Sequence, residues 1–330
     1  MASSETPFNI FIPDDKLKLL QQKLALVTFP DELEDSGMKY GVLLKDIQRL
    51  GFRVLNIHYV HKKSKVEDAV PLLFVHGWPG SFIEAPLPVA HKLMLALGYN
   101  KYVTEGGDWG GFITRKIALV YGSKHSKALH TNMAIGCTLT FYEPILYLCH
   151  LLMPYMAAEK ARLACTQWFT THRSGYSAEH STQPQTLGYL LADSPVGLLA
   201  WIYEKLVNWT DTYPWDDDVV LMWISIYFFS RSGPTASIHI YYKILGSSNM
   251  AVLGQKPAIP NGLLYFPKEV MAVPHIWTHT TGNIIFESEH TSGGHFLAHE
   301  KLQELVDDVR MMFGKGGPAF GVVPGKTGYK

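Results

Sequence analysis

The sequence predicts an α/β fold in which a mostly parallel sheet is flanked by helices, and three observations lead to this prediction. A continuous apolar run at residues 70–75 is typical of a strand buried on both faces. A glycine-rich turn at 106–111 joins a short strand pattern at 101–104 to a helical pattern at 112–120. Strand patterns return at 273–278 and 283–286, before an amphipathic helix at 300–313.

The order of these patterns divides the chain into four parts. Residues 14–26 and 43–50 have helical patterns, whereas alternation at 53–60 indicates a strand. An aromatic-rich block with helical signals at 196–207 and 219–229 separates the two groups of core strands. We therefore expect an N-terminal covering arm (1–50), a core (51–136 and 265–313), a helical insertion (137–264) and a flexible tail (314–330).

Composition narrows the class of protein. With 330 residues, a formal net charge of zero and 47% hydrophobic residues, the chain can bury a sizeable core, and its charge does not indicate nucleic-acid binding. Its three cysteines, Cys137, Cys149 and Cys165, lack the spacing of a zinc site or a disulfide framework. We expect a cytoplasmic protein, because no signal-peptide pattern is present and the most apolar stretches are shorter than the roughly 20 residues of a membrane span. Contact with a membrane surface and pairing into a homodimer are left open.

The glycine-rich turn Gly106-Gly107-Asp108-Trp109-Gly110 has the spacing of a nucleophile elbow, with a carboxylate in place of the usual serine. An aspartate that attacks a saturated carbon leaves an ester that water can cleave, whereas a serine would leave an inert ether. The motif therefore favours an epoxide or an alkyl halide as substrate. The simpler alternative is a turn in which Asp108 only caps the following helix.

A covalent ester at Asp108 needs a base, and the chain order nucleophile, acid, histidine selects His295 from 15 histidines. His295 lies in a glycine-rich loop after the last strand pattern. Glu269 is the preferred orienting acid, and Glu287 and Glu289 are its rivals. Backbone N–H groups of Trp78 and Trp109 are expected to stabilise an oxyanion, although residues 76–80 could equally form a plain Pro-Gly turn.

Several motifs in one order resemble the microsomal-type epoxide hydrolases, particularly fungal members without a membrane anchor. They are His76-Gly77-Trp78-Pro79-Gly80-Ser81-Phe82, the elbow at 106–110 and Gly293-Gly294-His295-Phe296, supported by residues 30–33, 193–198 and 266–269. The resemblance implies an α/β-hydrolase core with a helical lid and an N-terminal arm. It also implies hydrolysis of a lipophilic epoxide to a vicinal diol through an ester on Asp108, without a metal or organic cofactor. The apolar, aromatic lid suggests a role in detoxification or in secondary metabolite biosynthesis.

The resemblance further implies two lid tyrosines that donate to the epoxide oxygen. Tyr176 and Tyr241 occupy the corresponding positions, which composition alone could not select from 17 tyrosines. Tyr242 is the alternative to Tyr241 as the second donor. The simpler interpretation of all three is aromatic packing within a helical lid.

The chain departs from this pattern between residues 81 and 105. A helix, a strand and a second helix would need on the order of 40 residues, but only 25 are present, and residues 90–97 supply just the last helix. We expect a strand to be missing from the middle of the sheet, with unpaired backbone groups unless neighbouring strands close the gap. A second shortening is expected between residues 50 and 51. The competing hypotheses are a haloalkane dehalogenase, which shares the aspartate elbow, and a non-catalytic remnant or binding protein.

Overall fold

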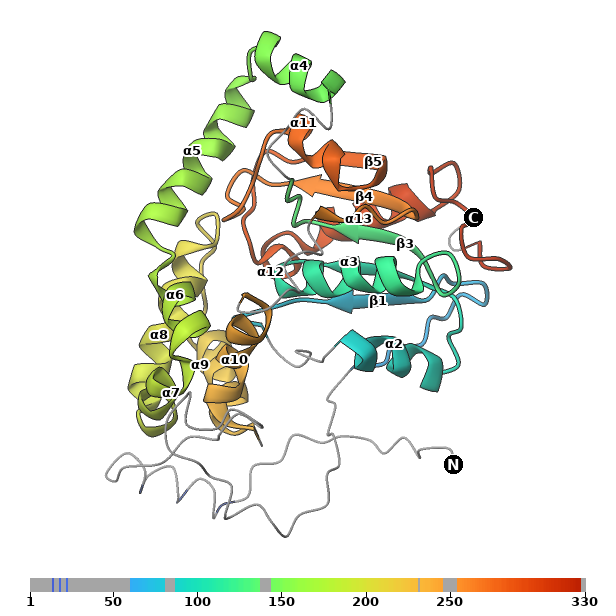
Figure 1. Ribbon diagram of the computed structural model, residues 1–330. Helices are drawn as coiled ribbons and strands as arrows, with labels where there is room; N and C mark the ends of the chain where they lie inside the picture. The colour runs from blue at the N-terminus through green and yellow to red at the C-terminus, as the bar shows by residue number, and fades with distance from the viewer. Residues whose placement is uncertain are drawn as a thin grey trace.

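The computed structural model describes residues 60–80, 87–136, 144–230, 232–245 and 254–327, together with the isolated helical residues Asp14, Lys18 and Gln22. The rest of the expected arm, the strand pattern at 53–59 and the second shortening lie outside the described residues. Within the described chain, the fold is a parallel sheet with helices on both faces and a group of helices at one end (Figure 1). The predicted α/β class is therefore confirmed.

The sheet has five described strands, all parallel, and their order in space is their order in the chain. They are β1 (Leu72–Val75), β2 (Tyr102–Gly106), β3 (Ser126–Thr131), β4 (Pro260–Tyr265) and β5 (Asn283–Glu289). Because all the strands run the same way, their carboxyl ends meet at one edge, where parallel α/β sheets place their ligands. The register pairs Val75 with Gly106, so β1 and β2 end side by side.

Helices cover the two faces of the sheet because alternate strand residues point to opposite sides. On one face, Tyr102 packs with Ile113 and Ile117 of α3 (Trp109–Tyr121) and with α2 (Leu87–Ala96). On the other face, Val103 packs with Met312 of α13 (Leu302–Phe313). These residues are almost fully buried. The elbow is therefore held between two apolar layers.

The helical insertion lies between β3 and β4 and faces the carboxyl ends of the strands (Figure 1). Two of its helices begin at capping residues. The Ser194 side chain accepts a hydrogen bond from the backbone N–H of Gly197, and Pro195 is the first residue of that helix. The Asp216 side chain accepts a hydrogen bond from the backbone N–H of Asp218 at the start of another. The described helices are α4 (Pro144–Leu152), α5 (Ala157–His172), α6 (Gly175–Thr182), α7 (Pro184–Asp193), α8 (Pro195–Asn208), α9 (Asp217–Phe228) and α10 (Gly233–Leu245).

One predicted strand is wrong and two strands were missed. Residues predicted as a strand at 273–278 instead form the short helix α11 (His275–Thr278), whose N-cap is Pro274, followed by the 3-10 helix η3 (His279–Thr281). The core strand before β5 is β4, whose proline and glycine weaken its strand pattern in the sequence. β3 was likewise not singled out. The insertion therefore ends before residue 260 rather than at 264.

The expected loose tail packs against the core as far as residue 327. After α12 (Leu297–Glu300) and α13, Ala319 and Val323 are buried in the apolar cluster that contains Met312 and Phe313. Apolar burial on the second face of the sheet thus fixes a segment whose glycine content suggested flexibility.

The shortened segment between β1 and β2 contains α2 and no strand among its described residues, 87–101. Of the two expected outcomes, the structure has the one in which neighbouring strands close the gap, because β1 pairs directly with β2. The shortening leaves β1 at the edge of the described strands, with Leu72 and Phe74 exposed by 41% and 38%. The shortening therefore exposes an edge strand, while the pairing of β1 with β2 that supports the elbow is intact.

Candidate active site

The elbow places Asp108 at the carboxyl edge of the sheet. β2 ends at Gly106 and α3 begins at Trp109, so only two residues make the turn. Asp108 has φ 51° and ψ −132°. Residues other than glycine rarely adopt this backbone conformation, and where they do, it is often at a functional site. A Cβ on Gly110 would lie 2.0 Å from the carbonyl oxygen of Val75. Glycine there lets α3 approach β1 closely enough to present the aspartate.

An imidazole bridges two carboxylates at this edge. His295 Nε2 lies 3.3 Å from Asp108 Oδ2, and His295 Nδ1 lies 2.6 Å from Glu269 Oε1. His295 and Glu269 are buried, whereas 12% of the Asp108 side chain is exposed. The backbone N–H of His295 donates to the carbonyl of Trp209 at 2.8 Å, which fixes the loop. The structure thus brings together the three residues that chain order selected.

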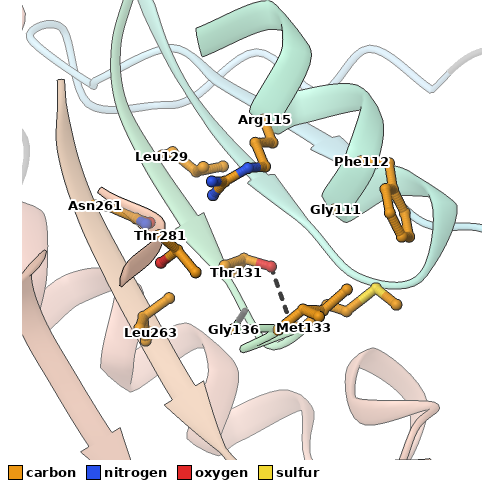
Figure 2. Close-up of a pocket in the computed structure, with 11 residues that line it drawn as sticks. Gly111, Phe112, Arg115, Leu129, Thr131, Met133, Gly136, Asn261, Leu263 and Thr281 are labelled. Carbon is orange, nitrogen blue, oxygen red and sulfur yellow. Dashed lines mark hydrogen bonds between the residues drawn. The ribbon is translucent and has the colours of Figure 1, made fainter. Parts of the chain in front are cut away.

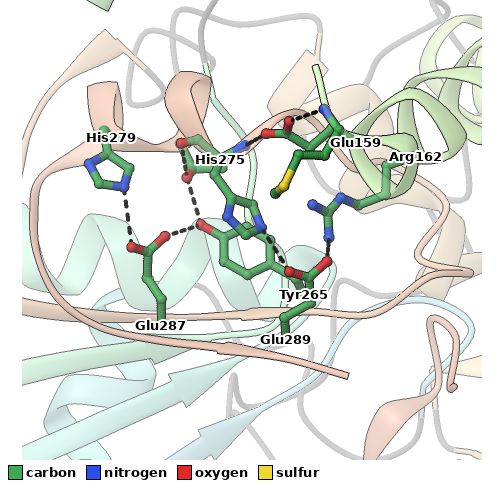
Figure 3. Close-up of polar contacts among 9 residues, drawn as sticks. Glu159, Arg162, Tyr265, His275, His279, Glu287 and Glu289 are labelled. Carbon is green, nitrogen blue, oxygen red and sulfur yellow. Dashed lines mark hydrogen bonds and ion pairs between the residues drawn. The ribbon is translucent and has the colours of Figure 1, made fainter. Parts of the chain in front are cut away.

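The rival acids are engaged elsewhere, as Figure 3 shows. Glu287 accepts from the Tyr265 hydroxyl at 2.6 Å and pairs with His279. Glu289 pairs with Arg162 of α5 at 2.8 Å. The Arg162–Glu289 pair ties the insertion to the core. Glu269 is therefore the carboxylate next to His295.

Charge in the site follows from this geometry. Burial would by itself lower the pKa of His295, but the charges of Glu269 and Asp108 and their hydrogen bonds outweigh it and raise the pKa to about 10. Burial would raise the pKa of Asp108, but its hydrogen bond to His295 and the charge of His295 hold it below its usual value. The resting site therefore holds an imidazolium between carboxylates.

Backbone donors occupy the other oxygen of the aspartate. The backbone N–H of Trp78 donates to Asp108 Oδ1 at 2.7 Å, and the backbone N–H of Trp109 also bonds the carboxylate. Gly77 is needed beside them, since a Cβ there would lie 1.8 Å from Asp108 Oδ1. The Trp78 amide therefore fixes Oδ1 while Oδ2 faces His295, a division suited to nucleophilic attack by Oδ2.

Two insertion tyrosines lie over this carboxylate. The ring of Tyr241 is edge-on to Trp109 at 4.7 Å, and that of Tyr176 stacks on Trp78 at 5.3 Å. Burial raises the pKa of both phenols, and the negative charge of Asp108 raises it further, so both stay protonated. Tyr241 is buried in this cluster, whereas Tyr242 is only half-buried and lies outside it. Of the two neighbours, the geometry places Tyr241 in the site.

Other residues of the site escaped the sequence prediction. Asn132, at the end of β3, donates to Glu269 Oε2 at 3.5 Å, and Trp209 lies edge-on to His295 at 5.1 Å. His180 lies between Tyr176 and Tyr241. The only available signal was its position four residues after Tyr176, which puts both side chains on one helix face.

A cavity of about 50 Å³ lies beside the elbow, between α3 and the strands β3 and β4 (Figure 2). It is lined mainly by apolar groups, including Phe112, Met133 and Leu263, together with Arg115. None of the residues around the Asp108 carboxylate lines it. Within the described residues there is no cluster of side chains suited to a metal ion, and no described helix is long and apolar enough to cross a membrane.

Fold and site together define an α/β-hydrolase with an aspartate elbow. A family model described as "Epoxide hydrolase N terminus" matches residues 51–85. The chain is 31% identical to "Putative epoxide hydrolase" of Stigmatella aurantiaca, over 93% of the chain and 84% of that protein, and 28% identical to "Epoxide hydrolase 1" of Sus scrofa, over 93% and 88%. The solved epoxide hydrolase of Aspergillus niger superposes with a TM-score of 0.69 at 26% identity, covering 93% of this chain and 95% of that one. This protein belongs to the epoxide hydrolase family.

The comparisons also agree with the shortened core. The alignment with the Stigmatella protein spans 386 positions, more than the 330 residues of this chain. The relative therefore carries segments inside the aligned span that this chain lacks. The aspartate, the histidine and the elbow glycines are nevertheless present and assembled.

Proposed function

We propose that the protein hydrolyses a lipophilic epoxide to a vicinal diol through a covalent ester on Asp108. The observation that carries the proposal is the arrangement around this carboxylate. The backbone amide of Trp78 fixes Oδ1, Oδ2 faces His295, and two protonated tyrosines lie above them. Such an arrangement can open a strained ring and then cleave the resulting ester.

In the first step, Asp108 Oδ2 attacks an oxirane carbon and forms a carbon–oxygen bond. The ring carbon–oxygen bond breaks, and its electron pair remains on the ring oxygen. Tyr176 or Tyr241 gives that oxygen a proton, so the leaving group is a neutral hydroxyl rather than an alkoxide. The high pKa of both phenols keeps the proton available until the ring opens.

Ester formation prepares the second step. The ester no longer carries the negative charge of Asp108, so His295 loses one of the two carboxylates that keep it protonated, and its pKa falls. His295 returns its proton to the tyrosinate that ring opening left behind, so the phenol is restored and the imidazole becomes neutral. Glu269 still holds Nδ1, so the imidazole stays oriented with Nε2 free to act as a base.

Neutral His295 then takes a proton from water, whose oxygen attacks the ester carbonyl carbon. The tetrahedral oxyanion is stabilised by the backbone N–H groups of Trp78 and Trp109, which already contact this carboxyl group. The bond between the carbonyl carbon and the alkyl oxygen breaks, and the diol takes the proton from His295. Asp108 is regenerated as an acid with one oxygen from water, and it gives its proton to His295, which restores the ion pair of the resting site.

Turnover of styrene oxide tests this proposal. Purified wild type should form phenylethanediol, and Asp108→Asn should lose at least about a thousandfold in rate because an amide is a poor nucleophile. Asp217→Asn, on the exposed start of α9, serves as the matched control and should keep the wild-type rate. Unchanged turnover in the Asp108 variant would reject the ester mechanism.

A haloalkane dehalogenase is the second candidate, and one observation favours it. The indole N–H of Trp78, whose backbone N–H bonds Asp108, is buried without a hydrogen-bond partner among the described residues, and N–H donors suit a departing halide. Two protonated phenols suit an oxygen leaving group better. Chloride release from 1-chlorobutane at a rate above diol formation would reverse this ranking. The cytoplasmic location, the homodimer and a role in detoxification or secondary metabolism stay predictions.

A further inference from the structure

A histidine on α6 lies among the aromatic residues above Asp108. His180 is fully buried, and its ring is edge-on to Trp78 at 4.7 Å and to Tyr241 at 4.8 Å. It follows Tyr176 by one helical turn, and the two rings lie 5.4 Å apart. His180 therefore belongs to the same wall as the two proposed proton donors, although the ester mechanism gives it no role.

The protonation state of His180 can be derived from its neighbours. The indole N–H of Trp201 donates to Nε2 at 3.2 Å, and because an indole nitrogen only donates, Nε2 carries no proton. Burial, and then the positive charge of Lys205, lower the pKa of His180 to about 3, so the ring is neutral. The ring proton is therefore on Nδ1.

This Nδ1–H group has no hydrogen-bond partner among the described residues, although the side chain is inaccessible to solvent. An unsatisfied buried donor destabilises a fold, and edge-on aromatic rings offer it at most a weak contact. Burial keeps the ring neutral, and the nearby Lys205 ammonium adds to this effect; it lies 5.2 Å from the Tyr176 ring centroid and 4.8 Å from that of Trp201. The Nδ1–H of neutral His180 is therefore an unused hydrogen-bond donor beside the phenols of Tyr176 and Tyr241.

We propose that His180 Nδ1–H binds an acceptor oxygen of the substrate next to the oxirane ring, which makes glycidyl ethers and related oxygen-substituted epoxides the preferred class. The inference rests on the proposed epoxide hydrolysis. With the oxirane oxygen between Tyr176 and Tyr241, a donor one helical turn from Tyr176 meets an atom a few bonds further along the substrate. A neutral N–H selects a neutral ether, hydroxyl or carbonyl oxygen.

A matched pair of substrates tests this preference. Butyl glycidyl ether and 1,2-epoxyoctane have the same length and differ only in an oxygen that replaces one methylene. Wild type should favour the ether in kcat/KM by about fivefold or more, the value of one hydrogen bond to a donor that is otherwise unsatisfied. In His180→Phe the preference should disappear. Because the ratio is measured within one variant, loss of folded protein cancels.

Two further variants separate hydrogen bonding from packing. His180→Gln retains an N–H donor and should keep more of the ether preference than His180→Phe. His239→Phe removes another buried histidine of the lid, one that makes no ring contact with either tyrosine among the described residues, and should keep the wild-type ratio. An ether preference that survives in His180→Phe, or falls equally in His239→Phe, would overturn the proposal.

Binding of the two product diols distinguishes this inference from the proposed function. 3-Butoxypropane-1,2-diol should quench tryptophan fluorescence of wild type at lower concentration than octane-1,2-diol, and the difference should vanish in His180→Phe. If wild type opens neither epoxide, the proposed function fails, while the diol comparison still reports on His180. Equal affinity of wild type for both diols would reject the donor role.

Discussion

Asp108→Asn should lower the pKa of His295 by about two to three units. In the wild type, His295 lies between Asp108 and Glu269, and its pKa is about 10. A unit charge at roughly 4 Å and an effective dielectric constant of about 20 contributes about 4 kcal/mol, which corresponds to about three pKa units. The asparagine oxygen can still accept from Nε2, so the fall should be somewhat smaller. The pKa of His295 should then lie at about 7 to 8, where the residue can act as a base.

The assay is NMR of protein labelled with ¹⁵N at histidine, titrated from pH 5 to 10.5. The resonance of His295 is identified by its absence in His295→Gln. The variant mimics the loss of charge on ester formation, so a pKa shift of less than about half a unit would refute the idea that alkylation of Asp108 prepares the base. A shift seen equally in Asp217→Asn would refute it as well.

The same ionisation contributes to stability. The pKa of His295 in the folded protein lies above the value of about 6.5 for an unfolded histidine. Its contribution to the free energy of unfolding is therefore fully present below about pH 6.5 and is lost as the pH rises towards 10. The stability difference between wild type and Asp108→Asn should shrink across this interval, as measured by urea unfolding at several pH values.

Three other substitutions probe the remaining parts of the site. Glu269→Gln should slow ester hydrolysis by about a hundredfold or more, so that intact-protein mass spectrometry detects the accumulated ester; an unmodified mass at steady state would contradict this. Gly110→Ala should lower the melting temperature and abolish activity, because its Cβ meets the Val75 carbonyl, whereas Gly175→Ala has open space and should do neither. Tyr241→Phe should lower kcat by about tenfold or more with little effect on KM, and an equal loss in Tyr242→Phe would exclude Tyr241 as the specific donor.

The parts of the site that depend on local chain chemistry could be predicted from the sequence. Glycines around Asp108 mark a turn that only small residues permit, and the glycine-rich loop at His295 follows the last strand. Chain order then pointed to Glu269. The lid tyrosines followed only from the resemblance, because nothing local distinguishes Tyr176 or Tyr241 from other tyrosines.

The remaining features depend on packing between distant segments. β4 contains a proline and a glycine, and it is a strand because β3 and β5 enclose it on both sides. The shortened segment lies beside the edge strand β1 rather than inside the sheet. The order of the strands in space shows this, and that order cannot be read from the sequence. The proton position on His180 depends on Trp201, 21 residues away on another helix.

A single turnover in heavy-oxygen water tests whether an ester forms on Asp108. With enzyme in excess over styrene oxide in H₂¹⁸O, the oxygen that opens the ring comes from Asp108 and the oxygen of water enters the carboxylate. We therefore expect an unlabelled diol and an ¹⁸O-labelled peptide that contains Asp108. A labelled diol with an unlabelled peptide would show direct attack by water and would rule out the ester.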